Sequence, residues 1–316
     1  MSQLLLLIVG MAGLWLGSEV LVRSATSITD RYLLSDAAFG MIVLAIGTDL
    51  PELFIAFDAS WRSLSGANLS GIVVGSAIGS SIGQFGLVFG VAGFIGFEAM
   101  RRRFLPRNTF FLLGSIAALF LASLDGRITR IEGMLLALFY ILYLTVVIAR
   151  RAASPDARVN NTGETSYRAW LMLAAGLVLL LLAAELTVLS ATGFARVVGL
   201  SEIAVSAIII GLGSSLPELS VSLNALLKNR GSLSAGNLLG SNILDTLLVP
   251  GIAATISPLA VPAAVLLIDL PTQLLVTVLV LLFLYVSRRG VQRPEASLLL
   301  IIYVGYIFIR MTGPGS

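Results

Sequence analysis

The sequence predicts an all-α integral membrane protein with ten transmembrane helices, arranged as two inverted repeats of five helices each. Three observations predict this fold: the chain is strongly apolar, its apolar residues form ten long stretches, and the second half repeats motifs of the first. Apolar residues make up 57% of the 316 residues and charged residues only 12%, whereas a soluble domain carries about 25% charged residues. Most of the surface of such a chain needs lipid around it.

Ten apolar stretches have the length of a membrane span, for which about 20 mostly apolar residues are needed. No basic segment precedes the first stretch and other spans follow it, so we expect a membrane helix there and not a cleaved signal peptide. The predicted spans are residues 3–23, 36–60, 68–96, 105–124, 129–149, 169–190, 200–226, 233–256, 266–287 and 295–311.

The one long polar stretch, 150–168, divides these spans into five and five. We therefore expect a first five-helix repeat at 1–149, a cytoplasmic linker at 150–168 and a second repeat at 169–316. With ten spans, fifteen Lys and Arg residues lie on one side of the membrane and five on the other. Because basic residues gather on the cytoplasmic side, this count places both termini outside.

Motifs of the first half recur in the second half at a nearly constant offset. Since each half has an odd number of spans, the two halves must enter the membrane in opposite senses, an architecture that recurs in secondary transporters. The matching blocks are 16–26 with 182–192 and 47–53 with 213–219 at an offset of 166, and 71–78 with 236–243 and 105–106 with 270–271 at an offset of 165.

Glu52 and Glu218 occupy matching positions inside predicted spans. An unpaired charge there costs at least about 2.5–3.5 kcal/mol, and such residues mark ion or substrate pathways by default. No Lys or Arg lies in the blocks 47–53 and 213–219 to neutralise either glutamate. Bound cations would supply the missing countercharge.

The neighbours of these glutamates carry hard oxygen ligands. Thr48 and Asp49 lie four and three residues before Glu52, on the same helix face, while Pro51 leaves the carbonyl of Gly47 without its helical donor. In the next spans the hydroxyl and carboxyl residues are spaced i, i+4: Ser76 with Ser80, and Ser241 with Asp245. Oxygen-only sites favour hard cations such as Ca²⁺.

The sequence has no Cys and no His. This excludes disulfides, zinc sites, haem ligation and Cys or His nucleophiles, and nothing suggests a membrane enzyme, a cofactor or nucleic-acid binding. The partners expected are small inorganic cations and the lipid bilayer, with no obligatory protein partner. A cation channel and a non-transporting scaffold are the other classes considered, and the inverted repeat with broken helices argues against both.

Gly-Thr-x-x-Pro-Glu at 47–52, Gly-Ser-Ser-x-Pro-Glu at 213–218 and Gly-Asn-x-x-Gly-Ser-Asn-Ile-x-Asp at 236–245 resemble the alpha-repeats of the cation/Ca²⁺ exchanger superfamily. The likeness covers nearly the whole chain and is greatest to prokaryotic sodium/calcium exchangers. It implies antiport of Ca²⁺ against Na⁺ by alternating access across a prokaryotic cell membrane, with ions held between spans 2, 3, 7 and 8. The ligands implied are hydroxyl and carboxyl groups at Thr48, Glu52, Ser76, Ser214, Ser215, Glu218, Ser241 and Asp245, and the carbonyls of Ala45 and Gly211.

The first half departs from the family pattern at two positions. Asp49 stands where Ser is usual, and Ser80 stands where Asn or Asp is expected; a second alignment places Gln84 there instead. We include Asp49 and Ser80 in the predicted metal site, which then holds four carboxylates. Because like charges in a dry site disfavour full ionisation, proton-coupled exchange of Ca²⁺ or another divalent cation stays an alternative.

Other acidic residues have simpler interpretations. Glu19 lies four residues before Arg23, so we expect an ion pair. Asp58 lies toward the outer end of its span and is expected to face water. Asp269 precedes Leu270-Pro271 and is interpreted as a helix N-cap with Pro just inside the helix.

Overall fold

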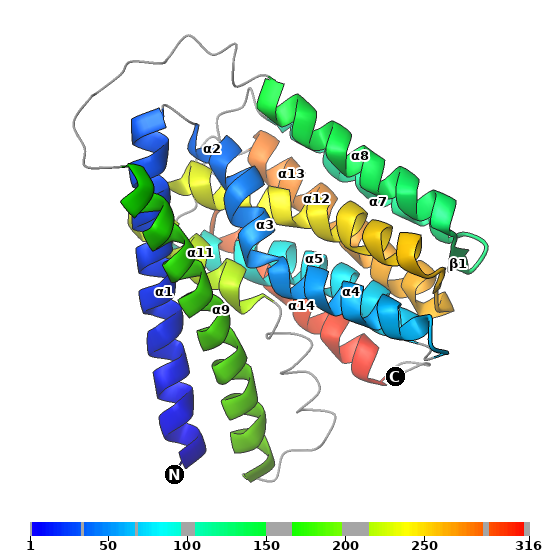
Figure 1. Cartoon of the computed structure of the whole chain (residues 1–316), viewed down its shortest axis with the longest axis horizontal. Helices are drawn as coiled ribbons and strands as arrows, with labels where there is room; N and C mark the ends of the chain where they lie inside the picture. Colours follow the sequence, from blue (N-terminus) through cyan, green and yellow to red (C-terminus); the bar gives the residue numbers. More distant parts are fainter. Residues whose placement is uncertain are drawn as a thin grey trace.

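The computed structural model describes residues 2–32, 35–66, 69–95, 105–149, 166–197, 215–286 and 291–312, and nearly all of them are helical (Figure 1). The helices are α1 (Ser2–Tyr32), α2 (Asp36–Phe39), η1 (Gly40–Leu44), α3 (Ala45–Thr48), α4 (Leu50–Ser63), α5 (Ser70–Gly83), η2 (Gln84–Val88), α6 (Phe89–Ile95), α7 (Leu105–Ser123), α8 (Arg130–Ala149), α9 (Ser166–Val197), α11 (Leu216–Leu227), α12 (Gly231–Ile256), η5 (Val265–Asp269), α13 (Leu270–Val286) and α14 (Arg293–Thr312), where η marks a π-helical segment. Two short strands, β1 (Arg127–Ile128) and β2 (Leu259–Ala260), pair antiparallel.

Seven of the described helices are long and apolar enough to cross a membrane, and the bent pair 36–48 and 50–63 raises the number to eight. Two shorter apolar helices, Asn108–Ser123 and Leu216–Leu227, fall on two further predicted spans. The first part of the predicted span 200–226 lies outside the described residues. The architecture is thus that of a multi-pass membrane protein, and the number ten stays a prediction.

Two predicted span boundaries differ from the structure. The first helix does not end at residue 23 but continues to Tyr32, because Arg23 is neutralised by Glu19 on the same helix and no Pro or Gly interrupts the chain there. The predicted span 36–60 is two helices, which meet at Asp49 with a bend of 47°.

Helix α12 forms the centre of the molecule, and nearly all of its residues are buried. It is apolar around most of its circumference, as expected for a helix surrounded by others, and α8, η1, α5, α11 and α4 all pack against it. Close approach to α2 and η1 requires glycine: a Cβ at Gly240 would lie 2.5 Å from the carbonyl oxygen of Met41 in η1, and one at Gly236 would clash with the carbonyl oxygen of Ala37 in α2.

Helices α1 and α9 form an antiparallel pair that runs across the direction of α12, α4 and α8 (Figure 1). Small residues bring the two backbones together, as in many membrane helix pairs. Cβ atoms at Gly10 and Gly17 would lie 3.0 Å or less from backbone atoms of Thr187 and Leu180, respectively. A Cβ at Gly176 would lie 2.8 Å from the backbone nitrogen of Leu21. An offset of 166 residues turns the first of these contacts into the last, so the pair has the internal symmetry of the repeat.

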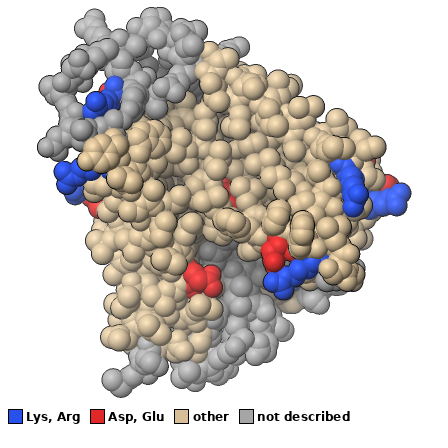
Figure 2. Space-filling model, in the orientation of Figure 1, with Lys and Arg blue, Asp and Glu red and all other residues tan. Residues whose placement is uncertain are grey.

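The visible surface carries few charges. On the face in Figure 2, most of the described surface has neither basic nor acidic side chains, and its Lys and Arg side chains lie toward the edges. Large apolar side chains such as Phe54, Leu135 and Leu182 are exposed on the helices. Such a surface suits a surrounding of lipid chains.

The predicted role of Asp269 as a helix N-cap is wrong. Asp269 does not start a new helix, because the π-helical segment η5 leads directly into α13. Its side chain is 1% exposed, and it forms an ion pair with Arg310 of α14 at 3.2 Å. Asp58, in contrast, is exposed as predicted and pairs with Arg62 at 2.8 Å.

Candidate cation site

The site lies where two helices break at matching positions of the repeat. Asp49 ends α3 and precedes α4 with φ −88° and ψ 7°, and Ser215 precedes α11 with φ −97° and ψ 1°. In both places Leu-Pro-Glu follows in the first helical turn, where Pro is tolerated because its missing N–H would have no helical partner. The break therefore puts Glu52 and Glu218 at helix N-termini, where backbone dipoles favour negative charge.

Four carboxylates meet behind these breaks. Asp49, Glu218 and Asp245 are 0% exposed and Glu52 is 2% exposed. The charges of Glu52, Glu218 and Asp245 all act on Asp49, and those of Glu218 and Asp245 act on Glu52. The side chains of Thr48 and Asp49 lie next to the Glu218 carboxylate. The structure therefore brings all four predicted acids together: Asp49 from the break between α3 and α4, and the others from α4, α11 and α12.

Most of the carboxylate oxygens in this group lack a donor. In the part of the chain that the structure describes, both oxygens of Asp49 and Glu218 and one oxygen each of Glu52 and Asp245 are buried without a hydrogen-bond partner. Each such group costs about 1–3 kcal/mol or more when it is charged. The ion pairs within the described residues use other acids: Glu19, Asp30, Asp36, Asp58, Asp125 and Asp269.

The hydroxyl and carbonyl residues of the prediction have different surroundings. Ser215 and Ser241 are buried, and neither hydroxyl has a hydrogen-bond partner among the described residues. Ser76 is only partly buried and donates to the carbonyl of Val73 on its own helix at 3.1 Å. The carbonyl oxygen of Ala45 accepts the backbone N–H of Asp49 at 3.0 Å. Gly211 and Ser214 lie outside the described residues.

Two residues outside the predicted set, Gln84 and Tyr140, also interact with this group, and a third, Asn237, is buried on the same helix as Asp245. Gln84, which the preferred alignment passed over for Ser80, donates from Nε2 to Oδ2 of Asp245 at 2.9 Å. Tyr140 of α8 is 1% exposed, and the charges of Asp49 and Asp245 act on it. Asn237 is buried one turn before Ser241 with both amide atoms unpartnered in the described part of the chain. The repeated motif could have indicated Asn237 by its i, i+4 spacing, whereas no local pattern marks Tyr140.

The acids form a spread group instead of one ready-made pocket for a metal. Among the described residues, no three acidic side chains converge closely enough to hold one ion by themselves. A single cation among these acids would therefore need neutral oxygens beside one or two carboxylates.

Comparison with known proteins agrees with this chemistry. A family model described as "Sodium/calcium exchanger protein" matches residues 2–149 and 168–312. The sodium/calcium exchanger MaX1 of Methanosarcina acetivorans is 25% identical over 346 aligned positions, covering 96% of this chain and 97% of MaX1. The uncharacterized membrane protein MJ0091 of Methanocaldococcus jannaschii is 30% identical over 299 positions, covering 94% of each chain.

Solved structures show the same fold. The sodium-calcium exchanger NCX_Mj, from crystals soaked with 10 mM Na⁺ and no Ca²⁺, superposes with a TM-score of 0.82 at 28% identity, covering 97% of this chain and 98% of that one. A second NCX_Mj structure, from crystals soaked with 100 mM Na⁺ and 10 mM Sr²⁺, gives a TM-score of 0.82 at 27% identity, covering 99% and 98%.

Proposed function

Because the chain belongs to the sodium/calcium exchanger protein family, whose members exchange Ca²⁺ for other cations, we propose that it carries Ca²⁺ across the cell membrane in exchange for Na⁺. The observation that carries this proposal is the group of four buried carboxylates, none of which has a basic partner among the residues that the structure describes. Leaving such a group empty and fully charged is unfavourable in a membrane. Either one Ca²⁺ or several Na⁺ supply the countercharge, so the two ions compete for the same oxygens.

The proposed ligands are the predicted residues, with Glu52 and Glu218 as the main contacts of the divalent ion. Their matched helix breaks and the symmetric packing of α1 on α9 support the inverted arrangement of two five-helix repeats, and the distribution of Lys and Arg supports the placement of both termini outside. The full proposed ligand set is Ala45, Thr48, Asp49, Glu52, Ser76, Ser80, Gly211, Ser214, Ser215, Glu218, Ser241 and Asp245.

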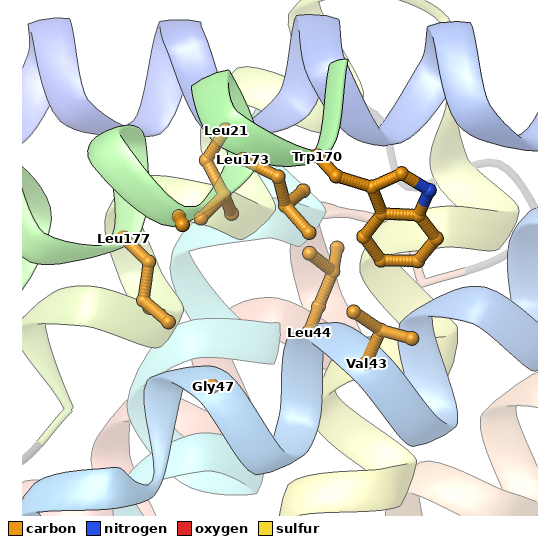
Figure 3. Close-up of a pocket in the computed structure, with 8 residues that line it drawn as sticks. Leu21, Val43, Leu44, Gly47, Trp170, Leu173 and Leu177 are labelled. Carbon is orange, nitrogen blue, oxygen red and sulfur yellow. The ribbon is translucent and has the colours of Figure 1, made fainter. Parts of the chain in front are cut away.

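Access to the site is proposed to alternate by movement of α1 and α9 against the other helices. The contact between this pair and the site is apolar and incompletely filled. Figure 3 shows a pocket of about 180 Å³ between Leu21 of α1, Leu173 and Leu177 of α9, and Leu44 and Gly47 beside the site. Leucine side chains that do not interlock tightly permit one helix to slide along another at small cost.

Asp49 supports proton coupling as a second candidate. A fourth carboxylate is 0% exposed and lies next to Glu218, so a proton is an alternative countercharge to one Na⁺. In that case Ca²⁺ entry into the site would release protons, and a proton gradient would drive Ca²⁺ transport without Na⁺.

Tracer Ca²⁺ uptake into proteoliposomes, with Na⁺ and proton gradients imposed separately, tests both candidates. We expect uptake with an outward Na⁺ gradient and none with a proton gradient alone; the reverse result would establish proton coupling. Glu52→Gln and Glu218→Gln should each abolish uptake because each removes a charge that binds the divalent ion.

Asp58→Asn is the matched control, since Asp58 lies on the same helix as Glu52 but is exposed and paired with Arg62. It should transport as the parent does. Near-normal uptake by either glutamine variant, with the protein folded, would overturn the proposed site.

A further inference from the structure

Gln84 has a position in the site that the preferred alignment of the repeat does not explain. It is the first residue of η2, directly after α5, and it is 0% exposed. Its Nε2 donates to Oδ2 of Asp245 at 2.9 Å and to Oγ of Ser80 at 3.3 Å. In the preferred alignment, at an offset of 165 residues, Ser80 corresponds to Asp245 and Gln84 to Val249; in the second alignment, at an offset of 161, Gln84 corresponds to Asp245 itself. The second half therefore has no amide at the matching position.

The local helix geometry places Gln84 there. Ser80 is too short to take the role of the longer Asn or Asp side chain that the family pattern expects. Gln84 follows one turn later, where the helix widens into the π-helical segment η2. Such single π turns inside α-helices are frequent at functional sites. The amide of Gln84 thus reaches the carboxylate of Asp245, on the helix that packs against α5.

The amide of Gln84 gives Asp245 a hydrogen-bond donor. Neither oxygen of those two carboxylates has a hydrogen-bond partner in the described part of the chain, whereas Oδ2 of Asp245 has the NH₂ group of Gln84. The donor assignment is the physically sensible one, since turning the amide by 180° would put Oε1 against a carboxylate. The positive end of the amide dipole therefore occupies the side of Asp245 from which a cation would otherwise be held.

We propose that Gln84 is a specificity-determining residue whose NH₂ group competes with transported cations for the carboxylate of Asp245. A cation that binds at this oxygen must displace the hydrogen bond or accept repulsion from the amide protons. Gln84 therefore weakens cation binding at one end of the site and hastens release. This inference rests on the proposed function in so far as Asp245 is a cation ligand, but it does not depend on which ion drives transport.

Two substitutions separate competition from a structural role. Gln84→Met keeps the length and removes the donor, whereas Gln84→Lys replaces the partial charge with a full one. If Gln84 competes with cations, the two variants should change affinity in opposite directions. Ca²⁺ and Na⁺ should bind about tenfold more tightly to Gln84→Met and at least about tenfold more weakly to Gln84→Lys, which is the range expected for hydrogen bonds to charged groups. A residue that only fills space predicts weaker binding by both variants.

Gln273→Met is the matched control. Gln273 is also 0% exposed, and its Nε2 donates to Oγ1 of Thr246 at 2.7 Å, beside Asp245 but to a hydroxyl and not to a carboxylate. Its replacement should change cation affinity by less than about threefold.

The experiment measures equilibrium Ca²⁺ binding to the purified protein in Na⁺-free buffer, Na⁺ competition against it, and tracer Ca²⁺ uptake in proteoliposomes. Gln84→Met should lower the half-saturating Ca²⁺ concentration and also lower maximal turnover, because release becomes slower. Shifts of both Gln84 variants in the same direction, or equal effects of Gln84→Met and Gln273→Met, would overturn the inference.

If Gln84→Lys does not fold, the comparison of the two methionine variants still decides the question. A parent that binds neither cation would instead overturn the proposed function, and a parent that binds both, without opposed shifts in the variants, would overturn only the role of Gln84.

Discussion

Gly240 tests whether the close packing of α12 against η1 holds the site in place. It precedes Ser241 on α12 and faces η1, where an added Cβ would lie 2.5 Å from the carbonyl oxygen and 2.7 Å from the Cα of Met41. Backbone atoms cannot rotate away as a side chain can. Gly240→Ala would therefore force α12 and η1 apart by about 1 Å to reach a normal contact of about 3.5 Å.

We expect two effects of this separation. Overpacking of a tight interface costs about 1–3 kcal/mol of stability, which thermal unfolding in detergent should show as a lower midpoint. The same displacement moves Ala45 away from Ser241, and a site loosened by more than about 0.5 Å loses its ligand geometry. Ca²⁺ affinity should therefore fall by at least about tenfold, measured by equilibrium binding.

Gly75 supplies the matched control, because it occupies the corresponding position of the first repeat, 165 residues earlier. A Cβ there meets no atom within 4 Å, and alanine is the better helix former by about 1 kcal/mol. Gly75→Ala should be neutral or stabilising, with unchanged Ca²⁺ affinity. If Gly240→Ala behaves like Gly75→Ala in both measurements, the contact of α12 with η1 does not fix the site and the reasoning is refuted.

Three further predictions concern movement and charge. The double variant Ser18→Cys with Asn224→Cys would cross-link α1 to α11, where Asn224 donates to Ser18 at 3.3 Å. Oxidation should stop turnover but leave equilibrium Ca²⁺ binding intact. Continued uptake with the cross-link complete would place the moving element elsewhere. Lys228→Met removes the 2.7 Å ion pair that joins α11 to Glu19 of α1 and should change the rate of tracer Ca²⁺ exchange severalfold without changing affinity, whereas an affinity change alone would contradict a gating role. Asp49→Asn should reduce Ca²⁺ affinity by at least about tenfold because one close negative charge is lost; calorimetry showing unchanged affinity would remove Asp49 from the site.

The sequence was informative wherever the chemistry repeated. Glu52 and Glu218 could be selected because two glutamates share Leu-Pro-Glu inside apolar spans, and both are buried at helix breaks. The Glu19–Arg23 pair followed from helical spacing alone. Apolar composition and periodic motifs are sufficient for such predictions because local spacing fixes which side chains share a helix face.

Interactions between distant parts of the chain could not be predicted in this way. Lys228 reaches Glu19 across 209 residues of sequence, and Arg310 neutralises Asp269 from another helix. Such pairs depend on how helices cross. The prediction of Asp269 as a helix cap was wrong for the same reason: the local Asp-Leu-Pro pattern is that of a cap, but the continuous helix and the burial of the side chain follow from packing against α14.

Asp49 and Gln84, which depart from the repeat, have opposite effects on the attraction of the site for cations. Asp49 adds a fourth carboxylate beside Glu218, which raises the attraction for cations and also the repulsion within the empty site. Gln84 adds a donor at Asp245, which lowers both. On the proposed function, the extra acid alone would strengthen Ca²⁺ binding and slow its release, whereas the extra amide alone would weaken binding. Because an exchanger must bind and release its ions at the same oxygens, we infer that the acid at 49 and the amide at 84 offset each other in the strength of cation binding.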